Sequence, residues 1–214
     1  MTKENEPVIL AIDLGTSGMK AALITISGRV LGWEVKPIGM HLTADGGVEQ
    51  DPEEWWEAFL DCSKRLVNKR IVPPDSVVAV CCSTQGEGTI PVDRDGKALT
   101  NCVLWMDTRG HADLLREHKG VVNISGMSAA KVLQWIKLTG GIPSTSGKDP
   151  AAHMLFIRNH QPEIYDRTYK FLNVVDYLNL RLTGCFTATY DSILTSWVTD
   201  NRRPDDIHYD SGLI

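Results

Sequence analysis

The chain has 214 residues, of which 43% are hydrophobic and 23% charged, and 22 Lys and Arg against 27 Asp and Glu give a formal net charge of −5. A chain of this size buries enough surface for a stable core, and its acidic balance argues against a nucleic-acid partner. It contains no apolar run long enough to cross a membrane, and its polar N-terminus does not match a secretory signal. We therefore expect a cytoplasmic protein.

The cysteines and histidines show no metal-binding spacing. An odd number of cysteines without CxxC pairing predicts reduced thiols, with the apolar run around Cys81 and Cys82 in the core. The six histidines lack HExxH or paired spacing and are expected at the surface or at helix ends. The five cysteines are Cys62, Cys81, Cys82, Cys102 and Cys185.

Three apolar segments open the chain. The first covers 8–12 between Pro7 and a glycine loop, the second covers 19–26, and a tight turn at 27–29 leads into the third at 30–35. Short apolar runs separated by turn residues predict an antiparallel meander of three strands.

A helix is predicted to begin at Asp51, because Asp51 offers an N-cap and Pro52 suits the first helical position. Apolar residues then recur at helical spacing up to Val67. Together with the meander, this predicts a mixed α/β fold. Further strands are predicted at 77–82, 89–92 and 169–174, and an apolar run covers 102–105. Further helices are predicted at 107–118, at 129–137, after an Asp149 cap and from an Asp176 cap to 182, and a loop is predicted after Thr199.

The segment 13–20, DLGTSGMK, joins the first two predicted strands. Its glycines permit a tight loop whose backbone N–H groups surround an anion, and Thr16 and Ser17 add hydroxyl donors. Asp13 suits a hydrated magnesium ion, which favours one or two carboxylates together with phosphate oxygens and water. No Walker A motif occurs. The spacing alone fits a metal-phosphate cradle and an ordinary hairpin equally well.

Two later loops carry polar and aromatic side chains suited to a polyol. Gln85 and Glu87 follow the predicted strand 77–82 and offer an amide and a strong acceptor to hydroxyl groups. Trp105 offers an apolar face to sugar C–H bonds. Taken alone, the first loop also fits a polar turn, and Trp105 also fits a core anchor.

The order of these motifs narrows the interpretation. DLGTS at 13–17, EQDP at 49–52, QGE at 85–87, WMDTR at 105–109 and DYL with LTG between 176 and 184 together resemble the N-terminal domain of the FGGY carbohydrate kinases, xylulokinase-type members above all. The likeness runs from about 8 to about 197. It implies the RNase H-like α/β fold of the actin, sugar kinase and Hsp70 ATPase superfamily, with a mixed sheet, antiparallel first three strands and flanking helices.

The resemblance also implies a site and its cofactors, ATP and Mg²⁺. Glycerol kinases have Gln-Arg-Glu and xylulokinases Gln-Met-His where this chain has QGE, so the sugar or polyol stays open, with a pentulose such as xylulose favoured. The implied cofactor-binding residues are Asp13 (also the metal-associated acid), Gly15, Thr16, Ser17 and Lys20, and the implied substrate-binding residues are Gln85, Gly86, Glu87, Trp105 and Asp107.

The family's general-base Asp lies in a Gly-rich segment that does not occur before Ile214, and the adenosine-binding C-terminal lobe is also missing. We therefore expect 1–214 to be an incomplete N-terminal lobe, inactive alone, of an enzyme that phosphorylates a sugar or polyol. Alternatives are a non-catalytic sugar-binding or regulatory module and a different ATPase of the superfamily. For 121–137, a lid, a homodimer contact and simple packing stay open, with packing the default.

Overall fold

A computed structural model describes residues 6–213, which divide into two compact units. The first unit contains the residues up to Met40 together with 50–85, and the second contains 41–49 and the residues from Gly86 onward. The chain therefore passes between the units at three points: after Met40, before Gln50 and after Gln85.

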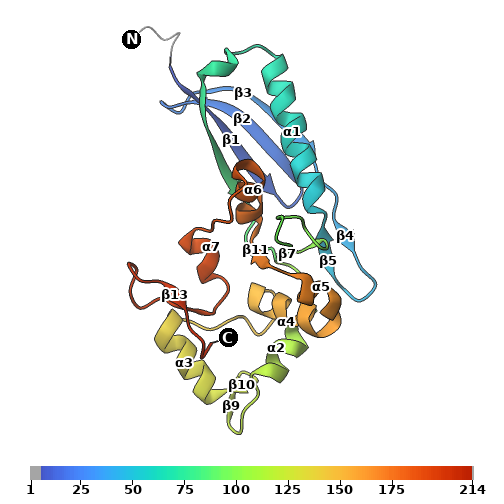
Figure 1. Cartoon of the computed structure of the whole chain (residues 1–214), viewed down its shortest axis with the longest axis vertical. Helices are drawn as coiled ribbons and strands as arrows, with labels where there is room; N and C mark the ends of the chain where they lie inside the picture. Colours follow the sequence, from blue (N-terminus) through green and yellow to red (C-terminus); the bar gives the residue numbers. More distant parts are fainter. Residues whose placement is uncertain (1–5, 214) are drawn as a thin grey trace. The chain divides into compact units, whose positions relative to one another are not determined.

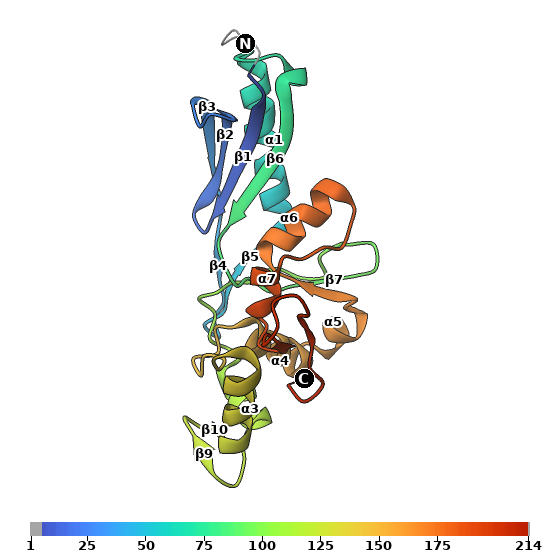
Figure 2. The same cartoon turned by 90° about the vertical axis from the view of Figure 1, so that its left-hand side faces the viewer.

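The first unit is a four-stranded sheet with one long helix along it (Figure 1). The strand order is β3-β2-β1-β6; β1, β2 and β3 form the predicted antiparallel meander, and β6 runs parallel to β1. Figure 2 shows β6 beside β1. The elements are β1 (Val8–Gly15), β2 (Gly18–Thr25), β3 (Val30–Pro37), α1 (Pro52–Asn68), a short 3-10 helix η1 (Pro74–Ser76) and β6 (Val77–Thr84).

Alternation along the strands places the core between the sheet and α1. Val8, Ile12 and Leu14 of β1 are buried on one face, and Met19 and Leu23 of β2 are buried likewise. The helix α1 packs against β2 and β3. Each large apolar side chain that is fully buried stabilises the fold by about 1.5–3 kcal/mol. The buried apolar side chains of α1 recur at a spacing of three or four: Trp55, Ala58, Phe59, Cys62 and Leu66.

The prediction of buried thiols holds for Cys62 and Cys102 and is wrong for the other three cysteines. Cys81 is exposed and Cys82 is partly exposed, because β6 is an edge strand while α1 covers β2 and β3. Cys185 is exposed beyond the C-terminus of α6. An apolar run predicts a strand, but it does not say which strand lies at the edge of the sheet.

The second unit consists of short sheets and helices. β4, β5 and β8 form one sheet, and β7 with β11, β9 with β10, and β12 with β13 form two-stranded pairs. The elements are β4 (His41–Leu42), β5 (Val48–Gln50, whose last residue belongs to the first unit), β7 (Ile90–Val92), β8 (Cys102–Val103), α2 (His111–Glu117), β9 (Asn123–Ile124), β10 (Met127–Ser128), α3 (Ala129–Thr139), α4 (Pro150–His160), α5 (Pro162–Arg167), β11 (Lys170–Leu172), α6 (Val174–Thr183), α7 (Tyr190–Leu194), β12 (Thr199–Asp200) and β13 (His208–Tyr209).

Several predicted helix starts in this unit differ from the structure. The predicted helix 107–118 begins only at His111. Asn173, not Asp176, is the N-cap of α6, and Asp176 is the acid at the third helical position of a capping box. Asp149 precedes α4 as predicted, but its carboxylate accepts the N–H of Ser144 instead of capping the helix. The tail predicted as loop contains β12 and β13.

The segment 121–137 forms the β9–β10 hairpin and most of α3. Val132, Trp135 and Leu138 of this helix are buried in an apolar cluster with Met127 and Leu213. Part of the segment therefore contributes to the core of the second unit, as the packing alternative expects. Among residues 6–213, no helix is long and apolar enough to span a bilayer.

The cap of α1 gives a stability test. The Asp51 carboxylate accepts the Glu53 N–H at 2.8 Å. Asp51→Ala should therefore lower the free energy of unfolding by about 1 kcal/mol, whereas Asp51→Ser, which keeps a capping oxygen, should retain most of the wild-type stability. Asp75→Ala in η1 is the control, with an expected change below about 0.5 kcal/mol. Urea denaturation followed by circular dichroism measures this; equal effects of Asp51→Ala and Asp75→Ala would contradict the cap.

Candidate functional site

The predicted phosphate loop is the tight turn between β1 and β2. Gly15 and Gly18 pair across it, with Thr16 and Ser17 at the tip, and neither glycine has a positive φ. A Cβ at position 18 would lie 2.8 Å from the carbonyl oxygen of Lys36, so the approach of β3 requires Gly18. A Cβ at position 15 would meet only ordinary contacts at 3.7 and 3.8 Å. Packing therefore does not require Gly15, and its missing side chain leaves room for a ligand.

Asp13 and Lys20 are cross-strand neighbours beside this turn. The Lys20 Nζ lies 2.8 Å from Asp13 Oδ2, and the two side chains are 59% and 49% exposed. An ion pair this exposed contributes little stability, so a metal ion or phosphate can compete for either partner. No cluster of three or more candidate metal ligands occurs in residues 6–213. A magnesium ion beside Asp13 fits only with phosphate and water oxygens as further ligands, the coordination that Mg²⁺ commonly keeps.

Gln85 was expected to contact the substrate, but its amide is bonded within the first unit. Its Oε1 accepts the Thr16 hydroxyl at 2.9 Å, and its Nε2 donates to Gln50 Oε1 at 2.8 Å. The Thr16 hydroxyl hydrogen is therefore also used in the fold. Ser17 is exposed at the tip of the turn, and its hydroxyl forms no hydrogen bond within the described part of the chain.

Gly86 and Glu87 follow in the second unit. A Cβ at Gly86 would meet nothing within 4 Å. Glu87 has a φ of 52°, a conformation that L-residues other than Asn and Asp rarely adopt. Partial burial raises the pKa of the Glu87 carboxyl, and the nearby Asp149 raises it further. Asp149 is itself buried, which raises its pKa. The sequence predicts Asp149 only as a helix cap and gives no sign of its electrostatic effect on Glu87.

Trp105 and Asp107 lie on the loop after β8 and differ sharply in exposure. Trp105 is 40% exposed, whereas Asp107 has no exposed surface. The Asp107 carboxylate accepts the N–H of Val48 at 2.9 Å and the side-chain Nε of Arg109 at 3.0 Å. Arg109 also donates to Glu49 at 2.6 Å. In this structure Asp107 therefore holds the loop in place and has no oxygen exposed to a substrate.

His153 connects the two substrate loops from α4. Its Nε2 lies 3.3 Å from the Asp107 carbonyl oxygen, which can only accept, so Nε2 carries the proton and Nδ1 accepts the Thr89 hydroxyl at 3.0 Å. Burial lowers the pKa of His153 to about 4. The prediction that histidines lie at the surface or at helix ends is wrong for this fully buried residue, since its partners come from distant parts of the sequence.

The predicted site residues thus fall into two groups, one in each unit. The first unit holds Asp13, Gly15, Thr16, Ser17, Lys20 and Gln85, and the second holds Gly86, Glu87, Trp105 and Asp107.

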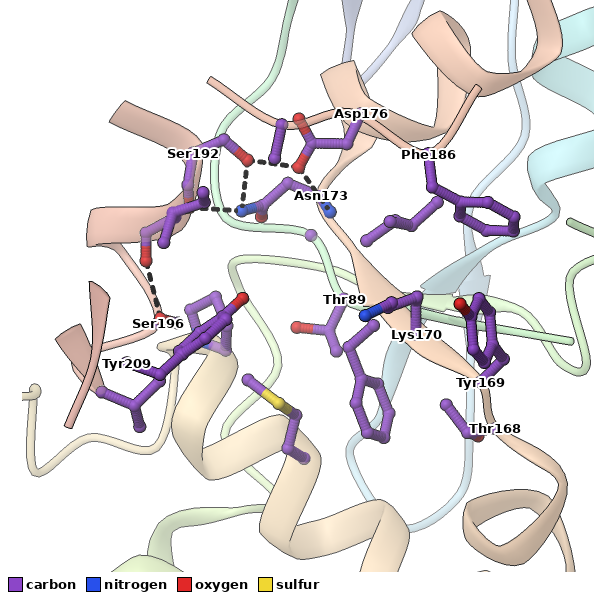
Figure 3. A pocket seen from close by; sticks show the side chains of 18 of the residues that line it. Thr89, Thr168, Tyr169, Lys170, Asn173, Asp176, Phe186, Ser192, Ser196 and Tyr209 are labelled. Atoms are coloured by element: carbon purple, nitrogen blue, oxygen red, sulfur yellow. Dashed lines mark hydrogen bonds between the residues drawn. The ribbon is translucent and has the colours of Figure 1, made fainter. Parts of the chain in front are cut away.

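A cavity of about 520 Å³ lies elsewhere in the second unit (Figure 3). Lys170, Phe186 and Tyr209 are among its lining residues, and none of the predicted site residues lines it. At its edge the Ser192 hydroxyl donates to Asp176, and Asn173 donates to Ser192. These bonds join the start of α6 to α7.

The antiparallel meander, the helix along it and the parallel fourth strand define the fold of sugar kinases and actin-like ATPases, as predicted. A gluconate kinase from Lactobacillus acidophilus superposes with a TM-score of 0.78 at 21% identity, covering 97% of this chain and 39% of that chain. The family model of the FGGY carbohydrate kinases, N-terminal domain, matches residues 8–203. The chain belongs to this family, which confirms the resemblance found in the sequence.

Curated relatives include kinases of two kinds. A xylulose kinase from Bacillus subtilis (strain 168) is 28% identical over 183 residues, and a glycerol kinase from Thermococcus gammatolerans (strain DSM 15229 / JCM 11827 / EJ3) is 29% identical over 191 residues. Each alignment covers 85% of this chain, and 34% and 38% of the respective relative. The chain therefore spans little more than a third of the length of these relatives. The two identities do not separate xylulose from glycerol as a substrate.

The depressed pKa of His153 predicts acid sensitivity. The unfolded chain has the ordinary value of 6.5 and the folded chain about 4, so between these values the unfolded state binds more protons and folding loses stability as pH falls. The loss should reach about 3 kcal/mol at pH 4. In His153→Gln, which can keep both hydrogen bonds, this part of the pH dependence should disappear. The measurement is urea denaturation between pH 7.5 and pH 4.

The exposed His41 provides the control, because His41→Gln removes a histidine without removing a buried imidazole. A wild-type slope retained in His153→Gln would show that other groups cause the acid sensitivity.

The two glycines flanking Glu87 should respond oppositely to alanine. A Cβ at Gly88 would lie 2.6 Å from Val174 Cγ2 and 2.8 Å from Cys102 Sγ, so Gly88→Ala should lower the free energy of unfolding by about 1–3 kcal/mol. Gly86→Ala should leave it unchanged or raise it by up to about 1 kcal/mol. Thermal or urea denaturation of the two variants measures this, and a Gly86→Ala variant as unstable as Gly88→Ala would contradict the open space beside Gly86.

Proposed function

We propose that this chain supplies the phosphate-binding and substrate-binding part of an ATP-dependent carbohydrate kinase acting on a sugar or polyol, with a pentulose such as xylulose favoured. The observation that carries the proposal is the β1–β2 turn in a member of the FGGY family. In this turn the half-exposed Asp13 carboxylate lies close to Gly15, a glycine that packing does not require.

The turn is the proposed place for the nucleotide phosphates. The backbone N–H group of Ser17, the Ser17 hydroxyl and the Lys20 ammonium are donors suited to phosphate oxygens. Asp13 would hold Mg²⁺ together with phosphate and water oxygens. When bound, MgATP supplies the transferable phosphoryl group and a cation that neutralises its charge. Asp13 and Lys20 would position the charged phosphates and the cation. Their ion pair with each other is exposed and weak, so it does not prevent them from binding these ligands.

The substrate is proposed to bind at the loop after Gln85 and at Trp105. Glu87 would accept hydrogen bonds from substrate hydroxyls. Trp105 would cover an apolar sugar face, and Gly86 leaves space beside Glu87. Gln85 and Asp107 are proposed to position these loops, because their polar groups are already bonded to the protein.

We assign no general base to residues of this chain. The contribution proposed for it is positioning: two reactants held in one geometry react as if their local concentration were very high.

Titrations of the ¹⁵N-labelled chain test the proposal. MgATP should shift the amide resonances of Gly15 to Gly18, and D-xylulose or glycerol should shift the Glu87 amide and the Trp105 indole. Glu87→Gln should weaken sugar binding about 10-fold, because it removes a charged hydrogen-bond acceptor, and should leave the MgATP shifts intact. Asp13→Asn should abolish the effect of Mg²⁺ on ATP binding.

Glu57→Gln on the exposed side of α1 is the control, expected to change neither titration. If MgATP leaves the turn unshifted at tens of millimolar, the nucleotide assignment is wrong. If both polyols leave Glu87 and Trp105 unshifted at the same concentrations, the substrate assignment is wrong.

A further inference from the structure

Gln50 is a buried residue that is not among the proposed phosphate-binding or substrate-binding residues. It has no exposed surface. Its Nε2 donates to the carbonyl oxygens of Thr16 at 2.7 Å and of Gly39 at 3.0 Å. Its Oε1 accepts from Gln85 Nε2 at 2.8 Å and from the Trp55 indole at 3.2 Å. Both ends of the amide therefore have two partners within the first unit.

The partners fix the direction of every hydrogen bond in this group. Two carbonyl oxygens and an indole N–H leave only one orientation for the Gln50 amide. Gln85 must then turn its NH₂ group toward Gln50 and its oxygen toward Thr16. As a result, the Thr16 hydroxyl must donate. The chain Gln50 to Gln85 to Thr16 thus has a single polarity, and reversing any member would leave two donors or two acceptors facing each other.

These bonds join all the points at which the chain enters or leaves the first unit. Gly39 directly precedes Met40, where the chain first leaves. Gln50 is the residue at which it returns, and Gln85 is the last residue before it leaves again for Gly86 and Glu87. Thr16, which accepts from Gln50 and donates to Gln85, is the tip of the phosphate turn.

We propose that Gln50 and Gln85 are positioning residues that couple the substrate loop to the phosphate turn, an inference that rests on the proposed function. Gln85 is bonded covalently to Gly86 and by its side chain to Thr16. A ligand that changes the backbone at Gly86 and Glu87 therefore changes the geometry of the Gln85 amide, and Gln85 passes that change to the turn. The coupling is reciprocal, so phosphate at the turn also alters the substrate loop.

The first test needs no ligand. Gln85→Met and Thr16→Val each remove the Thr16–Gln85 bond with little change in volume. Gln85→Met also removes the bond to Gln50 Oε1, which keeps the Trp55 indole as a donor. The Gln85 N–H donates to the Leu14 carbonyl oxygen, and the Ile38 N–H donates to the Ser17 carbonyl oxygen. Hydrogen exchange of the Gln85 amide therefore reports order on the side of the substrate loop, and exchange of the Ile38 amide reports order on the side of the turn. Thr16→Val should accelerate exchange at Gln85 about 10-fold, and Gln85→Met should accelerate it at Ile38 equally. The double variant should add nothing further.

Thr16→Ser, which retains the hydroxyl, should restore slow exchange, and Gln161→Met in the second unit is the control. Effects confined to the substituted side, or fully additive effects in the double variant, would overturn the proposal.

The second test uses magnesium pyrophosphate as the probe. In the wild type it should shift the amides of Gly15 to Ser17 and also those of Gly86 and Glu87. Gln85→Met should keep the first set of shifts and lose at least half of the second, which a merely structural role for Gln85 would not cause.

The outcomes separate the two proposals. Shifts at the turn that never reach Gly86 and Glu87 in the wild type overturn the coupling and leave the proposed function standing. No shift at the turn counts against the proposed function, and the exchange measurements without ligand then decide the coupling alone.

Discussion

A buried amide must have its hydrogen-bonding groups satisfied, and Gln50 meets this requirement in a way that organises the first unit. Its oxygen and nitrogen hold the β1–β2 turn, the segment before Met40 and the Gln85 side chain at once. Leaving such groups unpaired costs roughly 1–3 kcal/mol each. The turn at Thr16 is therefore held by tertiary bonds as well as by its own hairpin, and this order is what a phosphate site requires.

In the second unit, buried ionisable side chains likewise have their hydrogen-bonding groups satisfied by distant partners. Asp107 is fully buried and is satisfied by Arg109 and the Val48 N–H, while His153 stays neutral between Thr89 and the Asp107 carbonyl. These bonds fix the loops that carry Glu87 and Trp105, which themselves keep partly accessible side chains. In both units the residues proposed to meet ligands lie next to buried polar groups that determine their position.

Local sequence patterns predict the elements whose causes are local. The meander follows from three apolar runs and their turns, and α1 follows from Asp51, Pro52 and helical spacing. The order of short motifs identifies the family. The bonds of Gln85 with Gln50 and Thr16 join residues 35 and 69 positions apart, so no local pattern encodes them. The same holds for Asp107, for which the family resemblance implied a substrate contact but which Val48 and Arg109 surround in the structure, and for Cys81 at the sheet edge.

The Gln50 amide is locked in four hydrogen bonds, one of them to the Thr16 carbonyl oxygen of the β1–β2 turn, and the rest of the first unit depends on this arrangement. Hydrogen exchange of glutamine side-chain NH₂ groups, measured by NMR, tests it most directly, with the partly exposed Gln161 as the internal reference. The account predicts that both Gln50 Nε2 protons exchange at least about 100-fold more slowly than those of Gln161, because exchange requires opening of the buried network. Equal exchange rates for the two side chains would contradict it.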